Sequence, residues 1–280
     1  MPRYSREQVR RRRRTALGCL TLVVLLVFAS CTTVLVRAVS GAGGGAASTA
    51  EGDDDVLSLP STPQDAPIRS QLPKGVPVSS EQAIGIDVSG HQEDIDWQAA
   101  REDGVSFAYI KATEGSGFVD PQYSSHHDGA RAAGITVGAY HYFTLCSSGA
   151  DQAKDFLAAV TPADGDLPPA LDLEFDGACD ERPEAKHTQA EIEDFVAAVE
   201  KAWGRRVLVY ASADWRSHYG LEVTEERPDW LFSEGHPPRA ADWALWQVRF
   251  DATVAGVRGG VDLDVARIEI LRDQAALEES

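Results

Sequence analysis

Short apolar segments alternate with amphipathic segments from residue 84 to near the C-terminus. Apolar runs of about four to eight residues are typical of buried strands, and longer segments with apolar residues every three or four positions are typical of helices. The pattern predicts strands at residues 84–90, 107–115, 136–143, 168–175, 206–212, 228–234, 243–248 and 260–266. It predicts helices at residues 94–104, 120–134, 148–160 and 188–204, with weaker helices in the last third.

The helix at 188–204 has the clearest boundary signals. Thr188 and Glu191 have the spacing of a capping box, and Gly204 follows the last periodic residue. Strands that alternate with helices favour a parallel sheet covered by helices. Eight strands predict a closed α/β fold, an irregular TIM-like β/α barrel with some helices lost. An open doubly wound sheet is the alternative, but no Gly-rich nucleotide-binding motif follows any strand.

The first 80 residues follow a different pattern. An arginine cluster at residues 10–14 precedes an uncharged, mostly apolar run of 21 residues at 16–36. At about 1.5 Å per residue this run is long enough to cross a bilayer core, and the cluster predicts a cytoplasmic N-terminus. We therefore expect a basic cytoplasmic tail at 1–15 and a transmembrane anchor or signal segment at 16–37. The chain would be anchored to the cytoplasmic membrane, with its body outside.

Other fates of this segment stay open. A signal peptide would be cleaved and the protein secreted, although its apolar region is usually shorter. The residues ending at Cys31 resemble a lipoprotein cleavage box, and the arginine pairs resemble a twin-arginine export signal. Residues 38–80 are rich in Gly, Ser and Pro without a periodic apolar face, which predicts a flexible linker to a body at 81–280.

Charge narrows the choice of partners. The net charge is −18, but residues 1–40 hold eight Arg and one acid, so the rest has 18 basic and 43 acidic residues. Nucleic-acid binding needs a basic surface, so we expect no nucleic-acid partner. No His/Cys group has zinc spacing, and we expect neither a metal nor another cofactor.

Four acids lie on three of the predicted strands. Asp87 is near the end of the first, Asp172 and Glu174 are near the end of the fourth, and Asp262 is on the last. In barrel enzymes the carboxyl ends of the strands form the active-site face, so these acids could converge. Asp172 and Glu174, two positions apart, share a strand face, and a buried pair of this kind raises one pKa. Glycoside hydrolysis needs such a proton donor beside a second carboxylate.

A series of motifs runs in order through residues 84–268: GIDVSGHQEDIDW, FAYIKATEG, DPQYSSHHDGARAAGITVGAYHYF, PPALDLEFDG, VLVYAS, ALWQVRF and GVDLDVA. In these motifs the body resembles glycoside hydrolase family 25, the Chalaropsis-type lysozymes. The resemblance implies an irregular β/α barrel. It also implies a metal-free muramidase that cleaves the β-1,4 bond between N-acetylmuramic acid and N-acetylglucosamine in peptidoglycan, with retention of configuration.

The resemblance also implies roles for single residues. Glu174 matches the general acid/base, and Asp172 matches its partner, either a nucleophile or the group that assists the substrate's 2-acetamido group. Asp87 and Asp262 match further acids of the cleft. The candidates for substrate contact are Tyr142, Tyr210, Tyr140, Trp246 and Lys111, although Lys111 could instead pair with Glu114. Many members of the family have Asp-Leu-Asn where this chain has Asp262-Leu263-Asp264. The extra acid, Asp264, could perturb nearby pKa values or face solvent.

Two cysteines follow the third and fourth predicted strands. Because adjacent strands would bring Cys146 and Cys179 to one rim, and export is predicted, we expect a disulfide between them. His141 is expected to be a buried, hydrogen-bonded histidine. We expect a monomeric cell-wall hydrolase that binds peptidoglycan glycan strands. The competing hypotheses are a non-catalytic peptidoglycan-binding protein on the same barrel and a glycosidase for another polymer.

Overall fold

The computed structural model describes residues 59–277 except residues 77, 176–178, 221–226 and 241. In this part of the chain nine strands form one sheet, in the order β1-β9-β8-β7-β6-β5-β4-β2-β3. The strands are β1 (Gln82–Val88), β2 (Phe107–Glu114), β3 (Phe118–Val119), β4 (Thr136–Tyr142), β5 (Ala170–Leu173), β6 (Leu208–Ala211), β7 (Asp229–Phe232), β8 (Leu245–Ala252) and β9 (Val261–Arg267). Because β1 also pairs with β2, eight strands close into a barrel and β3 lies outside it. The predicted barrel and all eight predicted strands are confirmed.

One strand runs against the predicted direction. Seven barrel strands are parallel, but β9 is antiparallel to both of its neighbours, β8 and β1. Only residues 253–260 separate β8 from β9, and a parallel return needs a crossover of about a dozen residues or more. The reversal has a consequence for the site, because β9 begins at the end of the barrel where the other strands finish.

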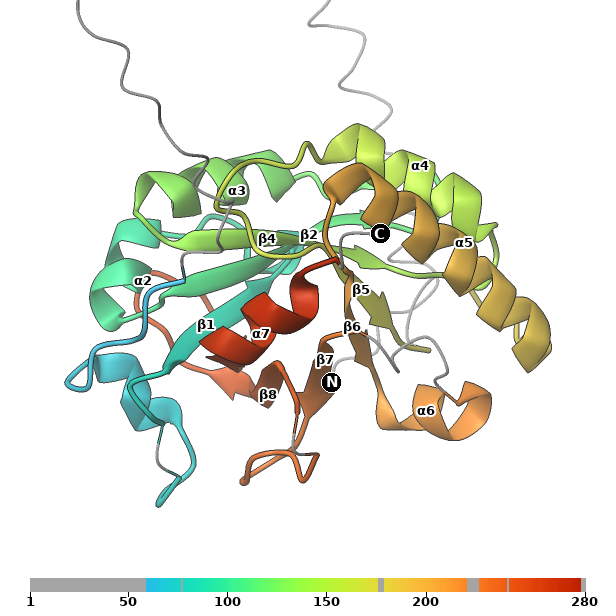
Figure 1. Cartoon of the computed structure of the whole chain (residues 1–280). Helices are drawn as coiled ribbons and strands as arrows, with labels where there is room; N and C mark the ends of the chain where they lie inside the picture. Colours follow the sequence, from blue (N-terminus) through green and yellow to red (C-terminus); the bar gives the residue numbers. More distant parts are fainter. Residues whose placement is uncertain (1–58, 77, 176–178, 221–226, 241, 278–280) are drawn as a thin grey trace, which may run out of the picture. The chain divides into compact units, whose positions relative to one another are not determined.

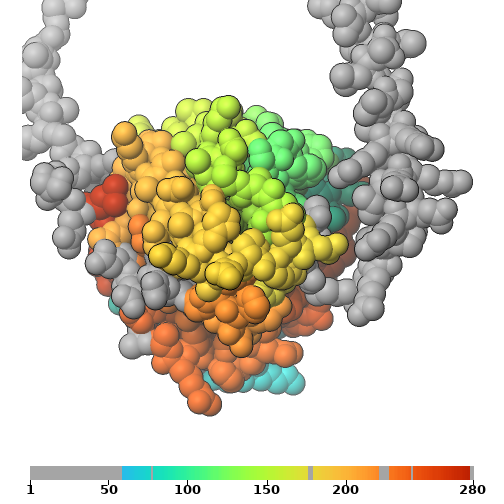
Figure 2. Space-filling model, turned by 90° about the vertical axis from the view of Figure 1, so that its right-hand side faces the viewer, coloured from blue at the N-terminus to red at the C-terminus, as the bar shows by residue number. Residues whose placement is uncertain are grey.

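The helices cover the barrel unevenly. They are α2 (Trp97–Asp103), α3 (Tyr123–Ala132), α4 (Gly149–Ala159), α5 (Ala185–Trp203), α6 (Ala213–Tyr219) and α7 (Ile268–Ala275). Figure 1 shows α3, α4 and α5 along one side of the barrel, whereas no helix of the described chain intervenes between β7, β8 and β9. In Figure 2 the side chains of α4 and α5 form a continuous surface on the covered side. The sequence predicted a barrel with some helices missing, and in the described chain the missing helices are those expected between β7, β8 and β9.

Strand alternation divides the core into two clusters. Inward-facing side chains such as Phe107, Leu208 and Leu245 pack inside the barrel. Outward-facing side chains such as Ile86 and Val209 pack between the barrel and its helices. Successive residues of a strand point to opposite faces, so each strand contributes to both clusters. The same alternation determines which polar side chains point inward at the end of the barrel.

The boundaries of α5 correct one prediction. Gly204 adopts a left-handed conformation (φ 64°) and ends the helix as expected. The predicted capping box is wrong, because the helix begins at Ala185 with Glu184 as its N-cap, which leaves Thr188 inside the helix. Glu191 instead accepts a hydrogen bond from the backbone N–H of Gly149 at the start of α4 (2.6 Å). Its carboxylate thus joins two helices rather than capping one.

The second half of the predicted linker is folded. Ile68, in the short helix η1 (Pro67–Gln71), is 1% exposed, and Leu59 is also buried. The Thr62 hydroxyl accepts a hydrogen bond from the Ile84 N–H (2.7 Å), and Arg69 donates to the Thr62 carbonyl (2.7 Å). Composition suggested a flexible coil, but isolated apolar residues anchor this segment where β1 and β2 begin. The folded body therefore starts well before residue 81.

The remaining N-terminal predictions lie outside the described residues. These are the basic tail (1–15), the apolar segment (16–37) and the first part of the linker. Among the residues that are described, no helix is both long and apolar enough to span a bilayer.

Candidate active site

The predicted acids meet at the end of the barrel where the parallel strands finish, which we call the mouth. Asp87 on β1 and Asp262 on β9 are directly opposite each other in the antiparallel register. Asp172 on β5 lies between Tyr142 on β4 and Tyr210 on β6. A cleft opens above them, lined by Asp87, Val88, Ser89, His91, Gln92, Lys111, Tyr140, Tyr142, Asp172, Glu174, Tyr210, Trp230, Gln247 and Asp262. Had β9 been parallel, Asp262 would lie at the opposite end.

Asp172 and Glu174 form the central pair. Asp172 is on β5, and Glu174 follows one residue after the strand ends at Leu173. Residues two apart on a strand face have Cα atoms roughly 6–7 Å apart. Oδ1 of Asp172 is buried and has no hydrogen-bond partner among the described residues. A buried acceptor of this kind is costly unless a ligand supplies the donor.

Burial and mutual repulsion raise the pKa values of the acids at the mouth. The pKa of Asp172 lies well above its usual range because of burial and the neighbouring Glu174, and Lys111 opposes this shift. Burial raises the pKa of Asp262 to about 9, with Asp87 and Glu174 adding to the shift. Burial raises the pKa of Asp87 to about 6, while hydrogen bonds from Gln247 and Asp264 limit the rise. The cleft therefore keeps some carboxyl groups protonated near neutral pH, as acid catalysis requires.

Three of the four predicted aromatic contacts line the cleft. Tyr140, Tyr142 and Tyr210 face inward on β4 and β6. Trp246 faces outward, is 1% exposed, and donates a hydrogen bond from Nε1 to the carbonyl of Ser233 (2.7 Å). The expected sugar contact of Trp246 is therefore wrong. The inward residue of this motif is its neighbour Gln247, which donates to Oδ2 of Asp87 (3.1 Å).

Comparison with known proteins assigns this arrangement to a family. Residues 86–257 match glycosyl hydrolases family 25. The chain belongs to this family. Lysozyme M1 of Streptomyces globisporus is 34% identical over 202 residues, covering 66% of this chain and 68% of that protein. Uncharacterized protein YegX of Escherichia coli (strain K12) is 35% identical over 189 residues, covering 65% and 68%.

The fold comparison agrees with the family assignment. The crystal structure of the bacterial lysozyme from Streptomyces coelicolor superposes with a TM-score of 0.62 at 30% identity. The match covers 69% of this chain and 98% of that chain. The protein is thus a glycoside hydrolase of the lysozyme type, and its cleft is the place where the predicted acids gather.

The family 25 cleft has an additional acid beneath its surface. Asp264, on the same face of β9 as Asp262, is completely buried, so the expectation that it might face solvent is excluded. Its Oδ1 accepts a hydrogen bond from Nε1 of Trp230 (2.8 Å), whereas Oδ2 has no conventional donor in the described chain. Burial, Asp87 and Asp262 raise the pKa of Asp264. A proton on Asp264 satisfies this arrangement, because it can be donated to Asp87.

Lys111 lies in the cleft and also forms the ion pair with Glu114 that was its alternative. Its side chain lines the cleft, and Nζ lies 2.7 Å from Oε2 of Glu114 and 4.5 Å from the centre of the Tyr142 ring. Its positive charge also limits the rise in the pKa of Asp172 that burial causes. Lys111 therefore connects the ion pair at the rim with the central carboxylate.

Sequence reasoning missed the turn after β1, which lines another part of the cleft. Ser89 caps the short helix η2 (Gly90–Gln92), and the Gln92 side chain accepts a hydrogen bond from the Ser89 N–H (2.9 Å). Asp120 accepts from the Gly90 N–H (2.8 Å) and would meet any Cβ at that position. These contacts fix His91 and Gln92 at the cleft. The spacing of Ser89 and Gln92 was the available signal.

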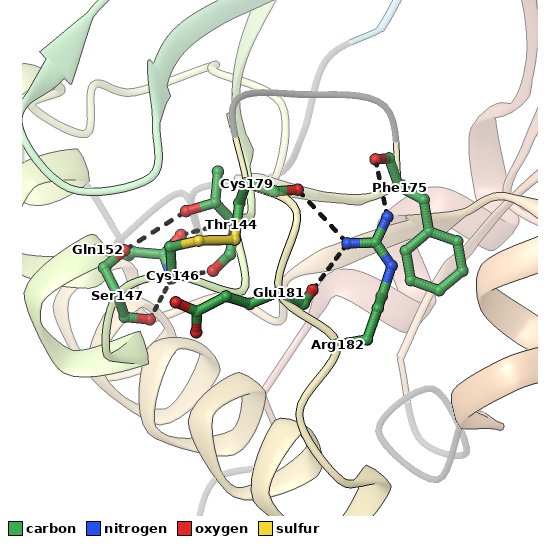
Figure 3. The surroundings of a disulfide bond; sticks show 8 residues. All are labelled: Thr144, Cys146, Ser147, Gln152, Phe175, Cys179, Glu181 and Arg182. Carbon is green, nitrogen blue, oxygen red and sulfur yellow. Dashed lines mark hydrogen bonds between the residues drawn. A yellow bond between two sulfur atoms is a disulfide. The ribbon is translucent and has the colours of Figure 1, made fainter.

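The predicted disulfide is confirmed. Cys146 and Cys179 are bonded, with Cα atoms 5.7 Å apart, in the segments that follow β4 and β5 (Figure 3). Arg182 donates to the carbonyls of Cys179 (3.4 Å) and Phe175 (3.4 Å) and lies over the Phe175 ring. Figure 3 shows the Arg182 guanidinium between the carbonyls of Cys179 and Phe175. The crosslink therefore restrains the rim beside the catalytic candidate.

His141 is a structural residue, as expected. It is fully buried on the outer face of β4 and stacks on Phe195 with ring centroids 4.7 Å apart. Gln152 donates from Nε2 to two carbonyls, so its Oε1 accepts from His141 Nε2 (3.0 Å). Nδ1 then accepts from the Thr113 hydroxyl (2.7 Å). Burial lowers the pKa of His141 to about 4, which keeps the ring neutral.

Proposed function

We propose that the protein is an extracytoplasmic muramidase. It would hydrolyse the β-1,4 bond between N-acetylmuramic acid and N-acetylglucosamine in peptidoglycan during cell-wall remodelling or catabolism. The observation that carries the proposal is the Asp172/Glu174 pair in the cleft of a family 25 chain. The similarity to Lysozyme M1 supports this substrate class.

Glu174 is the general acid/base in this proposal. It stands just past the end of β5, in the cleft and next to Asp172. Proton donation to the glycosidic oxygen would release the leaving sugar, and the resulting carboxylate would then activate water. Asp87 and Asp262 would bind and orient the sugars. The positive charge of Lys111 would favour the ionised form of Asp172 against the upward shift of its pKa that burial causes.

Asp172 would assist the substrate's own 2-acetamido group. Its buried Oδ1 needs a donor that the described residues do not supply, and an acetamido N–H is such a donor. A carboxylate in that contact would orient the acetamido oxygen toward the anomeric carbon and stabilise the positive charge that develops. The acetamido oxygen would displace the leaving sugar at the anomeric carbon, and water would then displace the acetamido oxygen. Each step inverts the anomeric carbon, so the two steps together retain its configuration. Direct attack by Asp172 would also give retention, but through a covalent glycosyl-enzyme.

The three tyrosines would form the sugar contacts. Tyr140, Tyr142 and Tyr210 line the cleft, with Tyr140 and Tyr210 buried and Tyr142 half-buried. Burial raises the pKa values of Tyr140 and Tyr210, so both hydroxyls stay protonated. Neutral hydroxyls can donate hydrogen bonds to sugar oxygens while the rings pack against pyranose faces. The enzyme would work as a monomer without a cofactor.

The N-terminal segment would hold the enzyme outside the cytoplasm. The disulfide supports an oxidising compartment, and the apolar run at 16–36 supports a membrane anchor at 16–37. N-terminal sequencing of the protein from cells tests this part. An intact N-terminus in the membrane fraction is expected, whereas a soluble form that begins near residue 40 would contradict the anchor.

Mass analysis of digested peptidoglycan tests the activity. The purified protein should release fragments with N-acetylmuramic acid at the new reducing end. Fragments that end in N-acetylglucosamine would indicate the other glycosidic bond, and the absence of any product would contradict the muramidase assignment. A thiazoline analogue of the cyclised acetamido intermediate should inhibit competitively. A trapped covalent ester on Asp172 would instead establish direct attack.

A further inference from the structure

Two phenylalanines at the mouth expose large parts of their rings. Phe232 at the end of β7 is 40% exposed, and Phe250 on β8 is 45% exposed. The rings stack on each other with centroids 4.4 Å apart and planes at 25°. Single exposed apolar residues are ordinary on protein surfaces. In such a stack each ring covers one face of the other, and the outer ring faces and edges form an exposed apolar surface, which we call the Phe232–Phe250 platform.

The platform continues the wall of the cleft. Trp230 lines the cleft, and Phe232 is two positions further along β7, so its side chain leaves the same face of the strand. The neighbour of Phe232 in the β7–β8 register is Gln247, which also lines the cleft and bonds to Asp87. The β8–β9 register shifts after Gln247, before β8 reaches Phe250.

We propose that the Phe232–Phe250 platform is an outer sugar-binding subsite. It would hold a pyranose of the glycan strand beyond the sugars bound at the central carboxylates, and it rests on the proposed activity. The C–H faces of a pyranose pack on flat aromatic surfaces, and a polymeric substrate necessarily extends past the bond that is cut. Because the platform is continuous with the cleft, a sugar of the same glycan strand is the expected occupant. A protein partner would need about 800 Å² per side, far more than two half-exposed rings provide.

Chain-length dependence of the kinetics tests the platform. The variant Phe232→Ala/Phe250→Ala should lower kcat/KM on long, uncrosslinked glycan strands by about tenfold, mainly through KM. On a tetrasaccharide that does not reach the platform, kcat/KM should fall by no more than about twofold. Phe232→Tyr should retain most of the activity on long strands, since it keeps the flat ring. Thermal unfolding of each variant establishes that it is folded.

Leu277→Ala is the matched control. Leu277 is 41% exposed and follows Ala276, which bridges to Arg205 before β6, at the opposite end of the barrel. This variant should change neither substrate's kinetics. Equal losses on both substrates with the double variant, or no loss on long strands, would overturn the platform. Altered self-association with unchanged glycan kinetics would also overturn it. If the wild-type protein cuts no glycan at all, the proposed function is wrong. This outcome differs from failure of the platform alone, in which the wild type is active.

Discussion

The two ends of the barrel interior come from the same strands but carry opposite kinds of side chain. At the end where the parallel strands begin, which we call the floor, inward positions are apolar, such as Leu208 on β6 and Leu245 on β8. Two residues further along, the same faces present Tyr210 and Gln247 to the cleft. The floor stabilises the fold by burying apolar surface. The mouth gathers carboxyl groups whose ionisation burial opposes, so its chemistry costs stability.

Removing a floor side chain should damage the fold without damaging the chemistry. Leu208 is completely buried inside the barrel, so Leu208→Ala should lower the free energy of unfolding by about 2–5 kcal/mol. Denaturant unfolding measures this loss. The protein that remains folded should keep kcat within about threefold of wild type. If the free energy of unfolding falls by less than about 1 kcal/mol, or if kcat falls strongly in the folded protein, the floor does not act on stability alone.

The disulfide lies at the mouth but should act on both properties. Cys146 and Cys179 close a loop with a sequence separation of 33, for which the chain-entropy description gives about 3–4 kcal/mol. Replacing both by Ser should lower the free energy of unfolding by about 2–4 kcal/mol. It should also lower kcat, since Cys179 follows β5 and Glu174 along the chain. Unfolding and kinetics measured on the reduced wild type provide the control, and unchanged kcat there would show that the crosslink does not position the rim.

Neutralising the buried acid should stabilise the mouth in a pH-dependent way. The pKa of Asp264 is raised in the folded protein, so the folded state retains a proton that the unfolded chain loses above its usual pKa near 4. Its contribution to stability is therefore most favourable in acid and declines as pH rises toward the folded pKa. The change is limited to about 1.4 kcal/mol per pH unit.

Asp264→Asn removes this titration and keeps an acceptor for Trp230 and a donor for Asp87. Its stability relative to wild type should increase between pH 4 and pH 7, as measured by unfolding at each pH. Asp273→Asn, at an exposed position of α7, is the control for removing one carboxyl group. A stability difference for Asp264→Asn that does not change with pH would show that this carboxyl is ionised in the folded protein.

The sequence predicted those parts of the fold that depend on local patterns. Apolar runs marked all eight barrel strands, and the two-residue spacing of Asp172 and Glu174 placed both in the cleft. The direction of β9 could have been inferred from its short connection to β8, but the expectation of a uniformly parallel sheet prevailed. The missed strand β3 has only two residues, too few to show a period.

Other errors arose where local sequence is ambiguous. The run around Trp246 is apolar on both sides, so it does not reveal which parity faces the cleft, and the large aromatic was chosen instead of Gln247. The segment at 59–76 has the composition of a linker, and only tertiary contacts of residues such as Ile68 order it. Asp264 is buried because of the antiparallel register between β9 and β1, and a single sequence does not specify this register.

Turnover and stability of Glu174→Gln, measured together, test the role of Glu174 as the general acid/base. We expect kcat on peptidoglycan to fall by at least about 10³-fold, with an unfolding temperature equal to or above that of wild type. Glu181→Gln, an exposed residue on the same rim outside the cleft, should leave both values unchanged. Wild-type turnover in a folded Glu174→Gln enzyme would contradict the account.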